Sequence, residues 1–127
     1  MWCGSIWLAT AQSDVDPKIK QKIIAAKSTD ARITKAWSGK NNRILASRWT
    51  EAWTEPGAPE TLMMPLQGLM TKEVVHRANR ARSNDFLSHP AGQVIGQITS
   101  ETSVRQTVMD MLSEFADAVE RLDSLVK

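Results

Sequence analysis

Apolar and polar positions along the chain follow spacings that predict a mostly helical fold with a few short strands. The clearest pattern comes near the end of the sequence, where apolar residues recur at three- and four-residue steps, the spacing of one helix face. Ser103 and Gln106 have capping-box spacing at the start of this segment. A long final helix is therefore predicted, with apolar positions Val104, Val108, Met111, Leu112, Phe115, Val119, Leu122 and Val126.

The first half of the chain predicts one helix followed by one strand. Asp16-Pro17 is typical of a helix start, with Asp as the N-cap and Pro at the first helical position. Residues 31–37 alternate and include β-branched side chains, which indicates a strand, and residues 38–42 have the composition of a turn. The apolar positions of the helix are Ile19, Ile23 and Ala26.

The middle of the chain predicts two more helices separated by an irregular loop. Asn42 is expected to cap a second helix, and residues 55–65, with three prolines and a glycine, are expected to be a loop. A third helix is predicted over 66–82, a loop over 83–92, and a short strand or extended segment over 93–98. The second helix would present Leu45, Trp49, Ala52 and Trp53 on one face, and the third would face inward with Leu69, Met70, Val74 and Ala78.

The chain opens with an apolar run from Met1 to Thr10 that has no polar lead-in. A soluble domain rarely begins this way, so the run is expected to lie within a buried element. A short buried strand, a turn at Gly4-Ser5 and a helical turn would account for it.

Composition places the chain among ordinary globular proteins. With 127 residues, 42% of them hydrophobic and 24% charged, one domain or one lobe of a larger protein is expected. The net charge of +2 does not by itself call for a nucleic-acid partner. Charge is uneven, because residues 18–48 carry nine Lys or Arg and one acid, and this pattern is typical of a solvated basic face.

Cysteine usage and hydropathy bear on the compartment. Cys3 is the only cysteine, so no internal disulfide can form, and a reducing, cytoplasmic location is predicted. No stretch approaches the roughly 20 apolar residues that span a bilayer, so no membrane association is expected. The first ten residues lack the basic segment of a secretory signal.

Few side chains in the sequence carry the usual signatures of catalysis. His76 and His89 are the only histidines, and no metal-ligand spacing, nucleophile elbow, Walker loop or dinucleotide-binding glycine pattern is present. A Cys–His nucleophile pair is left open by the sequence, although Cys3 is more typical of a small core residue. The tryptophans are expected to be packing residues, and both histidines are interpreted as surface or loop residues.

The Gly4-Ser5 corner has a more specific chemical meaning. A strand that turns at once into a helix presents free backbone N–H groups, Gly permits close approach, and the Ser hydroxyl adds a hydrogen-bond donor. Gly4 and Ser5 therefore predict a phosphate site, although most such corners bind nothing.

Several motifs, in this order, resemble the nitronate monooxygenases, formerly called 2-nitropropane dioxygenases. The run from Trp2 to Thr10 resembles the last barrel strand of that family, where a Gly-Thr or Gly-Ser meets the FMN phosphate. Residues 17–26 are similar to the family's lysine-bearing helix, and residues 29–35 to its "Thr-Asp-Thr-Val-x-Thr-Arg" strand. Later matches are Ser38-Gly39-Lys40 with Arg43-Ile44-Leu45, the segment 48–53, Pro65-Leu66-Gln67, Ala91-Gly92-Gln93 and the final helix.

The resemblance implies an α/β fold: the C-terminal part of a TIM-type (β/α)8 barrel with an inserted small lobe, the chain itself being mostly α-helical with a few short strands. Residues 1–10 would form the last barrel strand and phosphate turn, 11–100 a small substrate-side lobe, and 101–127 a C-terminal helix on the barrel. Trp2, Cys3, Gly4 and Ser5 would contact FMN. The N-terminal barrel segment, with the family's catalytic histidine and a second glycine-rich phosphate loop, is expected to be missing.

The implied activity is oxidation of alkyl nitronates with O2 by the complete flavoenzyme, the isolated chain being inactive. Neither His76 nor His89 matches the catalytic histidine, so no catalytic residue is assigned. Asn41-Asn42 also departs from the family's Pro-Ala at that turn. Two alternatives stay open: a flavin-dependent enoyl reductase of fatty-acid synthesis, which shares the corner and the lysine helix, and a small basic helical module that binds an acidic partner.

Overall fold

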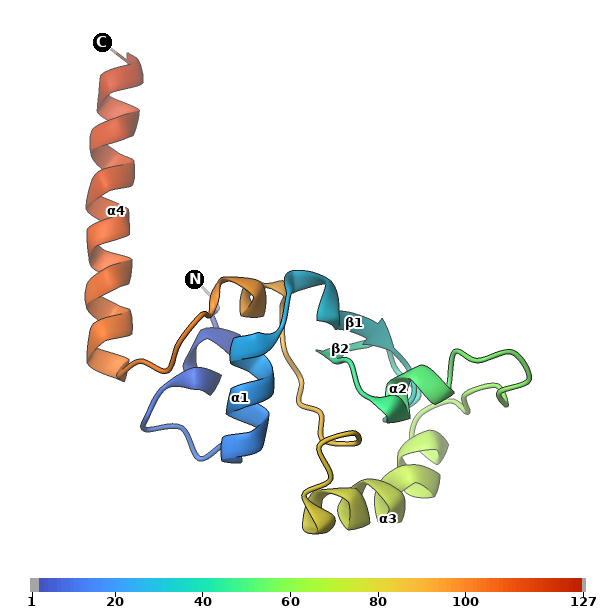
Figure 1. The fold of residues 1–127 in the computed structure, drawn as a ribbon. Coiled ribbons are helices and arrows are strands. Elements are labelled where there is room, and N and C mark those ends of the chain that lie inside the picture. The colour runs from blue at the N-terminus through green and yellow to red at the C-terminus, as the bar shows by residue number, and fades with distance from the viewer. Residues whose placement is uncertain (1–2, 127) are drawn as a thin grey trace.

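The computed structural model describes residues 3–126 and is mostly helical, with one two-stranded sheet (Figure 1). Four α-helices and three 3-10 helices accompany the sheet within this part of the chain. In chain order the elements are η1 (Ser5–Ala9), α1 (Pro17–Ala25), η2 (Ser28–Asp30), β1 (Ala31–Thr34), β2 (Asn42–Leu45), α2 (Arg48–Ala52), α3 (Leu66–Ala81), η3 (Gln93–Gln97) and α4 (Val104–Val126).

The apolar N-terminal run is in part as predicted. The expected helical turn is the 3-10 helix η1, but Cys3 and Gly4 form no strand within this chain. A strand needs a hydrogen-bonded neighbour, and the sheet of the described residues pairs only β1 with β2. Met1 and Trp2 lie outside the described residues.

Helix α1 begins where the sequence predicts. The Asp16 carboxylate accepts a hydrogen bond from the Lys18 amide (2.8 Å), and Pro17 occupies the first turn, where no N–H is needed. Ile19 and Ile23 are buried on one side of the helix. The amphipathic spacing therefore identified the packed face of α1 correctly.

The prediction that Asn42 caps a helix is wrong. Asn42 begins β2, which pairs antiparallel with β1 in the register Ala31↔Leu45 to Thr34↔Asn42. Leu45 enters the core in this pairing, so burial favours the strand over a helix. The helix begins after Ser47, whose hydroxyl accepts from the Thr50 amide while the Thr50 hydroxyl accepts from the Ser47 amide.

Helix α3 lies where the sequence predicts it, but its inward face was predicted wrongly. Leu69, Met70 and Val74 are exposed, and the buried positions are Gln67 and Thr71. Gln67 Nε2 donates to the Ala36 carbonyl (3.0 Å), and Thr71 Oγ1 donates to the Trp37 carbonyl (3.0 Å). The helix therefore uses polar side chains to satisfy backbone groups at the end of the hairpin, which leaves its apolar stripe outward.

The segment 93–98 is a 3-10 helix and not the predicted strand. Residues Gln93–Gln97 form η3, with Ile95 fully buried. Gly96 lies against the backbone of Ser28 in η2, so closely that a side chain at this position would overlap it. Close packing of η2 on η3 stabilises the compact turn in place of an extended segment.

The core is formed by residues that are far apart in the sequence, from Ala9 to Ile95. It lies where η1, α1, the hairpin and η3 meet, and it is closed by the loop after α3. Its buried members are Ala9, Ile19, Ile23, Ala31, Leu45, Leu87, Ala91 and Ile95.

Helix α4 extends away from the rest of the molecule (Figure 1). Its start is fixed by the Ser103 hydroxyl, which accepts from the Gln106 amide (3.0 Å), as the capping pattern predicts. Most of its apolar stripe is exposed, including Leu112, Phe115 and Leu122. None of the helices between residues 3 and 126 is long and apolar enough to cross a membrane.

Candidate phosphate-binding site

The corner predicted to bind phosphate lies at the start of η1. Gly4 is exposed, and a Cβ added to it would meet no atom within 4 Å, so the space above it is open. Ser5 is half-buried, and its Oγ accepts a hydrogen bond from the Gly92 amide (2.7 Å). Cys3 is half-buried beside them, and Trp2 lies outside the described residues.

A loop far away in sequence completes this corner. Residues 89–92 run along β2: the Leu45 amide donates to the His89 carbonyl (3.0 Å), and the Ala91 amide donates to the Arg43 carbonyl (3.1 Å). Because the Gly92 amide then donates to the Ser5 side chain, two backbone hydrogen bonds and one bond to a side chain hold the corner, the loop and the strand together.

These three segments line a shallow hollow, open to solvent, with a volume of about 390 Å³. It brings the predicted pair Gly4 and Ser5 together with residues that the sequence did not point to. No carboxylate of the described residues lines it. Its lining is formed by Gly4, Ser5, Leu8, Asn42, Arg43, His89, Pro90, Ala91 and Gly92.

Two basic side chains of this lining lie within hydrogen-bond distance of backbone carbonyls. The Arg43 Nη1 donates to the Ala31 carbonyl (2.8 Å), so the half-buried guanidinium is anchored on β1 at one N–H. The His89 Nδ1 lies 2.9 Å from the Pro90 carbonyl oxygen, which can only accept. Nδ1 therefore carries the hydrogen, and Nε2 is the nitrogen left for another group.

Lysines of α1 fix the segment that leads to His89. The Lys22 Nζ donates to the Asn84 carbonyl (2.9 Å) and to the Leu87 carbonyl (2.7 Å). Burial lowers the pKa of Lys22, while the carboxylates of Asp85 and Glu51 act in the opposite direction. This lysine therefore holds the loop through its donors and does not itself line the hollow.

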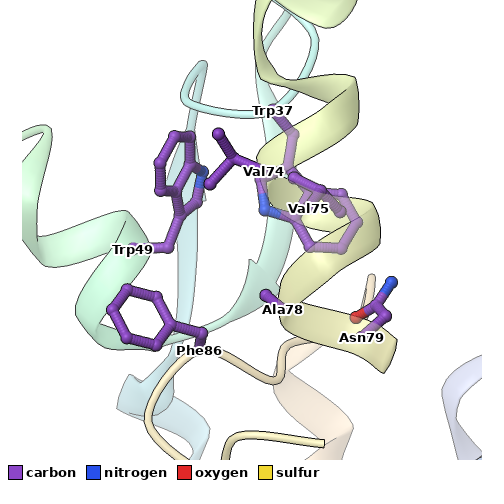
Figure 2. A pocket seen from close by; sticks show the side chains of 7 residues that line it. All are labelled: Trp37, Trp49, Val74, Val75, Ala78, Asn79 and Phe86. Carbon is purple, nitrogen blue, oxygen red and sulfur yellow. The ribbon is translucent and has the colours of Figure 1, made fainter. Parts of the chain in front are cut away.

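Figure 2 shows a second small cavity, between the hairpin, α2 and α3, lined by Trp37, Trp49, Val74, Val75, Ala78, Asn79 and Phe86. Its volume of about 10 Å³ leaves no room for an organic ligand. Trp49 also packs edge-to-face on Trp53, with ring centroids 5.7 Å apart. These contacts support the packing role predicted for the tryptophans.

Within residues 3–126, no hydrogen bond joins Cys3 to either histidine. His76 is exposed on α3, as predicted, and His89 lies in the loop at the hollow. Between residues 3 and 126, no three His, Cys, Asp or Glu side chains are grouped so that they could hold a metal ion.

Comparison with known proteins identifies the family. The Rv1533 protein of Mycobacterium tuberculosis, provisionally named a monooxygenase, is 35% identical over all of this chain and 36% of its own length. A Bacillus subtilis protein provisionally named a nitronate monooxygenase is 34% identical over 87% of this chain and 32% of its own length. The chain therefore spans about a third of these curated relatives.

Solved structures share the fold. FabK from Thermotoga maritima matches with a TM-score of 0.72 and 27% identity, covering 95% of this chain and 38% of FabK. The M276A mutant of the same protein matches with a TM-score of 0.64 and 25% identity, covering 95% of this chain and 34% of that one. The sequence profile of the nitronate monooxygenases matches residues 2–114. That match covers most of the sequence, and the chain belongs to the nitronate monooxygenase family.

Proposed function

We propose that this chain forms the phosphate corner and one wall of the substrate cleft of an FMN-dependent enzyme that oxidises alkyl nitronates with O2. The observation that carries the proposal is the Gly4-Ser5 corner, which opens into a hollow of about 390 Å³ without a carboxylate among its described lining residues. Membership of the family supports the class of reaction. A cytoplasmic location belongs to the same proposal.

The residues at the corner fit the phosphate end of FMN. The open space above Gly4 lets a phosphate approach the backbone, and the first turn of η1 offers amide donors that have no partner within the helix. The Ser5 oxygen accepts from Gly92, so the hydroxyl hydrogen remains for an anion. Cys3 and Trp2 are proposed as further contacts because they adjoin this corner in the sequence.

When bound, FMN supplies the redox chemistry of the reaction. The contribution of this chain is to hold the phosphate and to shape the cleft, and no residue of it is assigned as the catalytic base. We propose that residues 1–10 complete a TIM-type barrel supplied by the rest of the enzyme, that 11–100 form the substrate-side lobe, and that 101–127 pack on the barrel wall. The exposed apolar stripe of α4 supports that last placement.

A hybrid enzyme tests the proposal. Residues 1–127 replace the matched segment of the Bacillus subtilis relative, and bound flavin and O2 consumption with the anion of 2-nitropropane are measured. The hybrid is expected to carry stoichiometric FMN and to consume O2. Gly4→Val is expected to abolish flavin binding because its side chain fills the open space, whereas Ala11→Val adds comparable bulk at an exposed position and retains the flavin.

The hybrid also distinguishes the proposed enzyme from the second candidate, a flavin-dependent enoyl reductase. The fold match to FabK is compatible with this second candidate. Oxidation of NAD(P)H with an enoyl thioester, without nitronate turnover, would favour that enzyme. The isolated chain is expected to bind FMN poorly and to turn over no nitronate. A stoichiometric yellow flavin on the 127-residue product would contradict this expectation.

The third candidate, a basic module for an acidic partner, predicts salt-dependent binding to DNA or RNA by the isolated chain. Absent or salt-independent binding would reject it. The lysines of α1 argue against a free basic surface, because Lys18, Lys20 and Lys22 each donate to backbone carbonyls.

A further inference from the structure

We propose that α4 is a surface for self-association, through which two copies of this chain pair as antiparallel helices related by a two-fold axis. The occupant of the exposed apolar face of α4 is then the α4 of a second copy. This pairing goes beyond the proposed enzymatic function and does not depend on it. The copies that pair are those whose α4 is not covered by a barrel.

The exposed apolar residues of α4 follow a seven-residue repeat. From Val104 to Leu125 they recur at alternating steps of four and three, the spacing of the seam of a two-stranded coiled coil. Phe115 is 68% exposed and Leu125 is 76% exposed, so most of this seam has no partner among the described residues. Figure 1 shows that α4 projects from the rest of the molecule, so a second helix can reach the seam. The seam residues are Val104, Val108, Met111, Phe115, Ala118, Leu122 and Leu125.

The sizes of the seam residues fit an antiparallel pair. With the two-fold axis between Ala116 and Asp117, Phe115 of one copy faces Ala118 of its partner, so a large side chain lies opposite a small one. A parallel pair would instead place Phe115 against Phe115 and Ala118 against Ala118, which crowds one layer and underfills the next. The antiparallel layers are Phe115 with Ala118, Val108 with Leu125 and Met111 with Leu122, each occurring twice by symmetry.

Charges beside the seam favour the same arrangement. Glu114 and Arg121 lie seven positions apart on one flank of the seam, both are exposed, and neither forms an ion pair with another described residue. In the antiparallel pair each Glu114 lies beside the partner's Arg121, which gives two ion pairs related by the axis. In a parallel pair the same two side chains would lie beside the partner's Val119 and Val126, where they meet no charge.

A groove at the base of α4 has space for the last turns of the partner helix. It has a volume of about 320 Å³ and lies between η1, residues 94–100 and the first turns of α4. Ile6, Val94 and Met111 form part of its apolar lining. Because Met111 also belongs to the seam, residues 122–126 of the partner would run beside this groove. Apolar side chains at both ends of each helix are then removed from water.

The test is the oligomeric state of the full 127-residue chain, measured by sedimentation equilibrium and light scattering over a range of concentrations. A monomer–dimer equilibrium is expected. Glu114→Arg and Arg121→Glu each convert the two ion pairs into like-charge contacts, and each is expected to weaken the dimer about tenfold or more. Glu120→Arg is the matched control, because it makes the same charge change on α4 away from the seam, and it is expected to alter the dissociation constant less than about twofold.

A mixture of the two weakened variants tests the antiparallel geometry. Glu114→Arg and Arg121→Glu in one solution bring unlike charges together at both positions, so a 1:1 heterodimer with about the affinity of the unchanged chain is expected. A chain that is monomeric at every concentration overturns the inference, as does a chain that forms larger assemblies. A dimer that neither variant weakens, or one that is weakened without recovery in the mixture, overturns it as well.

The hybrid enzyme keeps this result distinct from the proposed function. The seam is the face that the proposed enzyme packs on its barrel wall, so pairing of two copies and docking on the barrel exclude one another. A dimeric chain together with a hybrid that lacks FMN counts against the proposed function alone. A monomeric chain together with a flavin-loaded hybrid counts against self-association alone.

Discussion

Arg82 Nε lies 2.7 Å from Asp16 Oδ2, so the residue that ends α3 is paired with the residue that caps α1. The Lys18 Nζ donates to the Arg82 carbonyl (2.9 Å), and the Lys18 amide donates to the other oxygen of Asp16 (2.8 Å). The start of α1 and the left-handed turn at Arg82, with φ of 47°, therefore stabilise each other. The amide of Lys18 and then the guanidinium of Arg82 lower the pKa of Asp16.

Arg82→Gln is expected to raise the pKa of Asp16, but not fully to its ordinary value of 3.8, because the stronger bond from the Lys18 amide remains. Titration of the Asp16 carboxyl carbon by NMR measures the change. Arg77→Gln removes an arginine that pairs with Glu73 on α3 and should leave Asp16 unaffected. An Asp16 titration that is identical in the chain and in Arg82→Gln would refute the proposed contribution of the pair.

Asp16→Asn is expected to destabilise the chain in a pH-dependent way. A carboxyl whose folded pKa lies below 3.8 contributes stability that is present above pH 3.8 and is lost as pH falls through the folded pKa. The difference in denaturation midpoint between the chain and Asp16→Asn should therefore be constant near neutral pH and should shrink in strong acid. A difference that does not change with pH would mean that Asp16 acts without its charge.

Lys22 is expected to make the stability of the chain depend on pH in the alkaline range. Its folded pKa is lowered below 10.5 by burial, so between the two pKa values the unfolded chain binds more protons than the folded chain. Stability should therefore rise with pH through this window. Lys22→Met should remove the rise and cost about 1–3 kcal/mol, because the Asn84 and Leu87 carbonyls lose their donor.

Chemical denaturation at several alkaline pH values measures this effect. Lys40→Met is the control, since Lys40 is exposed and its side chain makes no bond to the described residues. The same slope in the chain and in Lys22→Met would show that another group causes the pH dependence.

Local signals in the sequence were sufficient for the helix starts and insufficient for the hairpin. Asp16-Pro17 and Ser103 cap helices through bonds that span two or three residues, so neighbours in sequence determine them. Asn42–Leu45 is a strand because it pairs with residues 31–34, a partner that periodicity cannot identify. The face of α3 was misjudged because Gln67 bonds the Ala36 carbonyl, 31 positions away.

Local sequence likewise predicted one part of the candidate site and not the other. The Gly4-Ser5 corner was predicted because both residues are adjacent and carry the relevant chemistry. Arg43 and His89 join it through pairing of β2 with the 89–92 loop, which depends on hydrogen bonds across 44 and 48 positions of the chain. If residues 42–45 had been recognised as a strand, Arg43 would have been placed in the hairpin beside residues 31–34. No local signal pointed to His89.

Gly96 and Gly68 predict opposite effects of the same substitution. A Cβ at Gly96 would overlap the Ser28 amide nitrogen, so Gly96→Ala should separate η2 from η3 and destabilise the chain by about 1–3 kcal/mol. At Gly68, within α3, the nearest atom would be the Trp37 oxygen at 3.8 Å, an ordinary contact. Gly68→Ala should therefore stabilise the chain by roughly 0.5–1 kcal/mol through helix propensity.

Urea denaturation of both variants measures these effects. The denaturation midpoint is expected to fall in Gly96→Ala and to rise in Gly68→Ala. Stabilisation by Gly96→Ala would mean that η2 and η3 do not approach as closely as described. A loss of stability in Gly68→Ala would mean that the first turns of α3 lie closer to the hairpin than 3.8 Å implies.

Alanine substitutions at Gly39 and Gly57 distinguish the cost of backbone strain from the cost of steric overlap. Both have left-handed φ values, 80° and 87°, so alanine should cost roughly 1–2 kcal/mol at either position for the backbone alone. At Gly57 a Cβ would meet no atom within 4 Å, whereas at Gly39 it would lie 2.6 Å from the Met64 amide nitrogen. Gly39→Ala must therefore also displace the 62–64 backbone from the hairpin turn.

The loss of stability in Gly39→Ala is thus expected to exceed that in Gly57→Ala by about 1–3 kcal/mol, the usual cost of overpacking. Denaturant midpoints give the two values, and the Gln67 side-chain amide signal reports whether the loop has moved, because Gln67 accepts from the Leu62 amide (3.0 Å). Equal losses in the two variants would show that the loop yields freely and does not brace the hairpin. A larger loss with a shifted Gln67 signal would instead establish that residues 62–64 pack on the Gly39 turn and fix the start of α3.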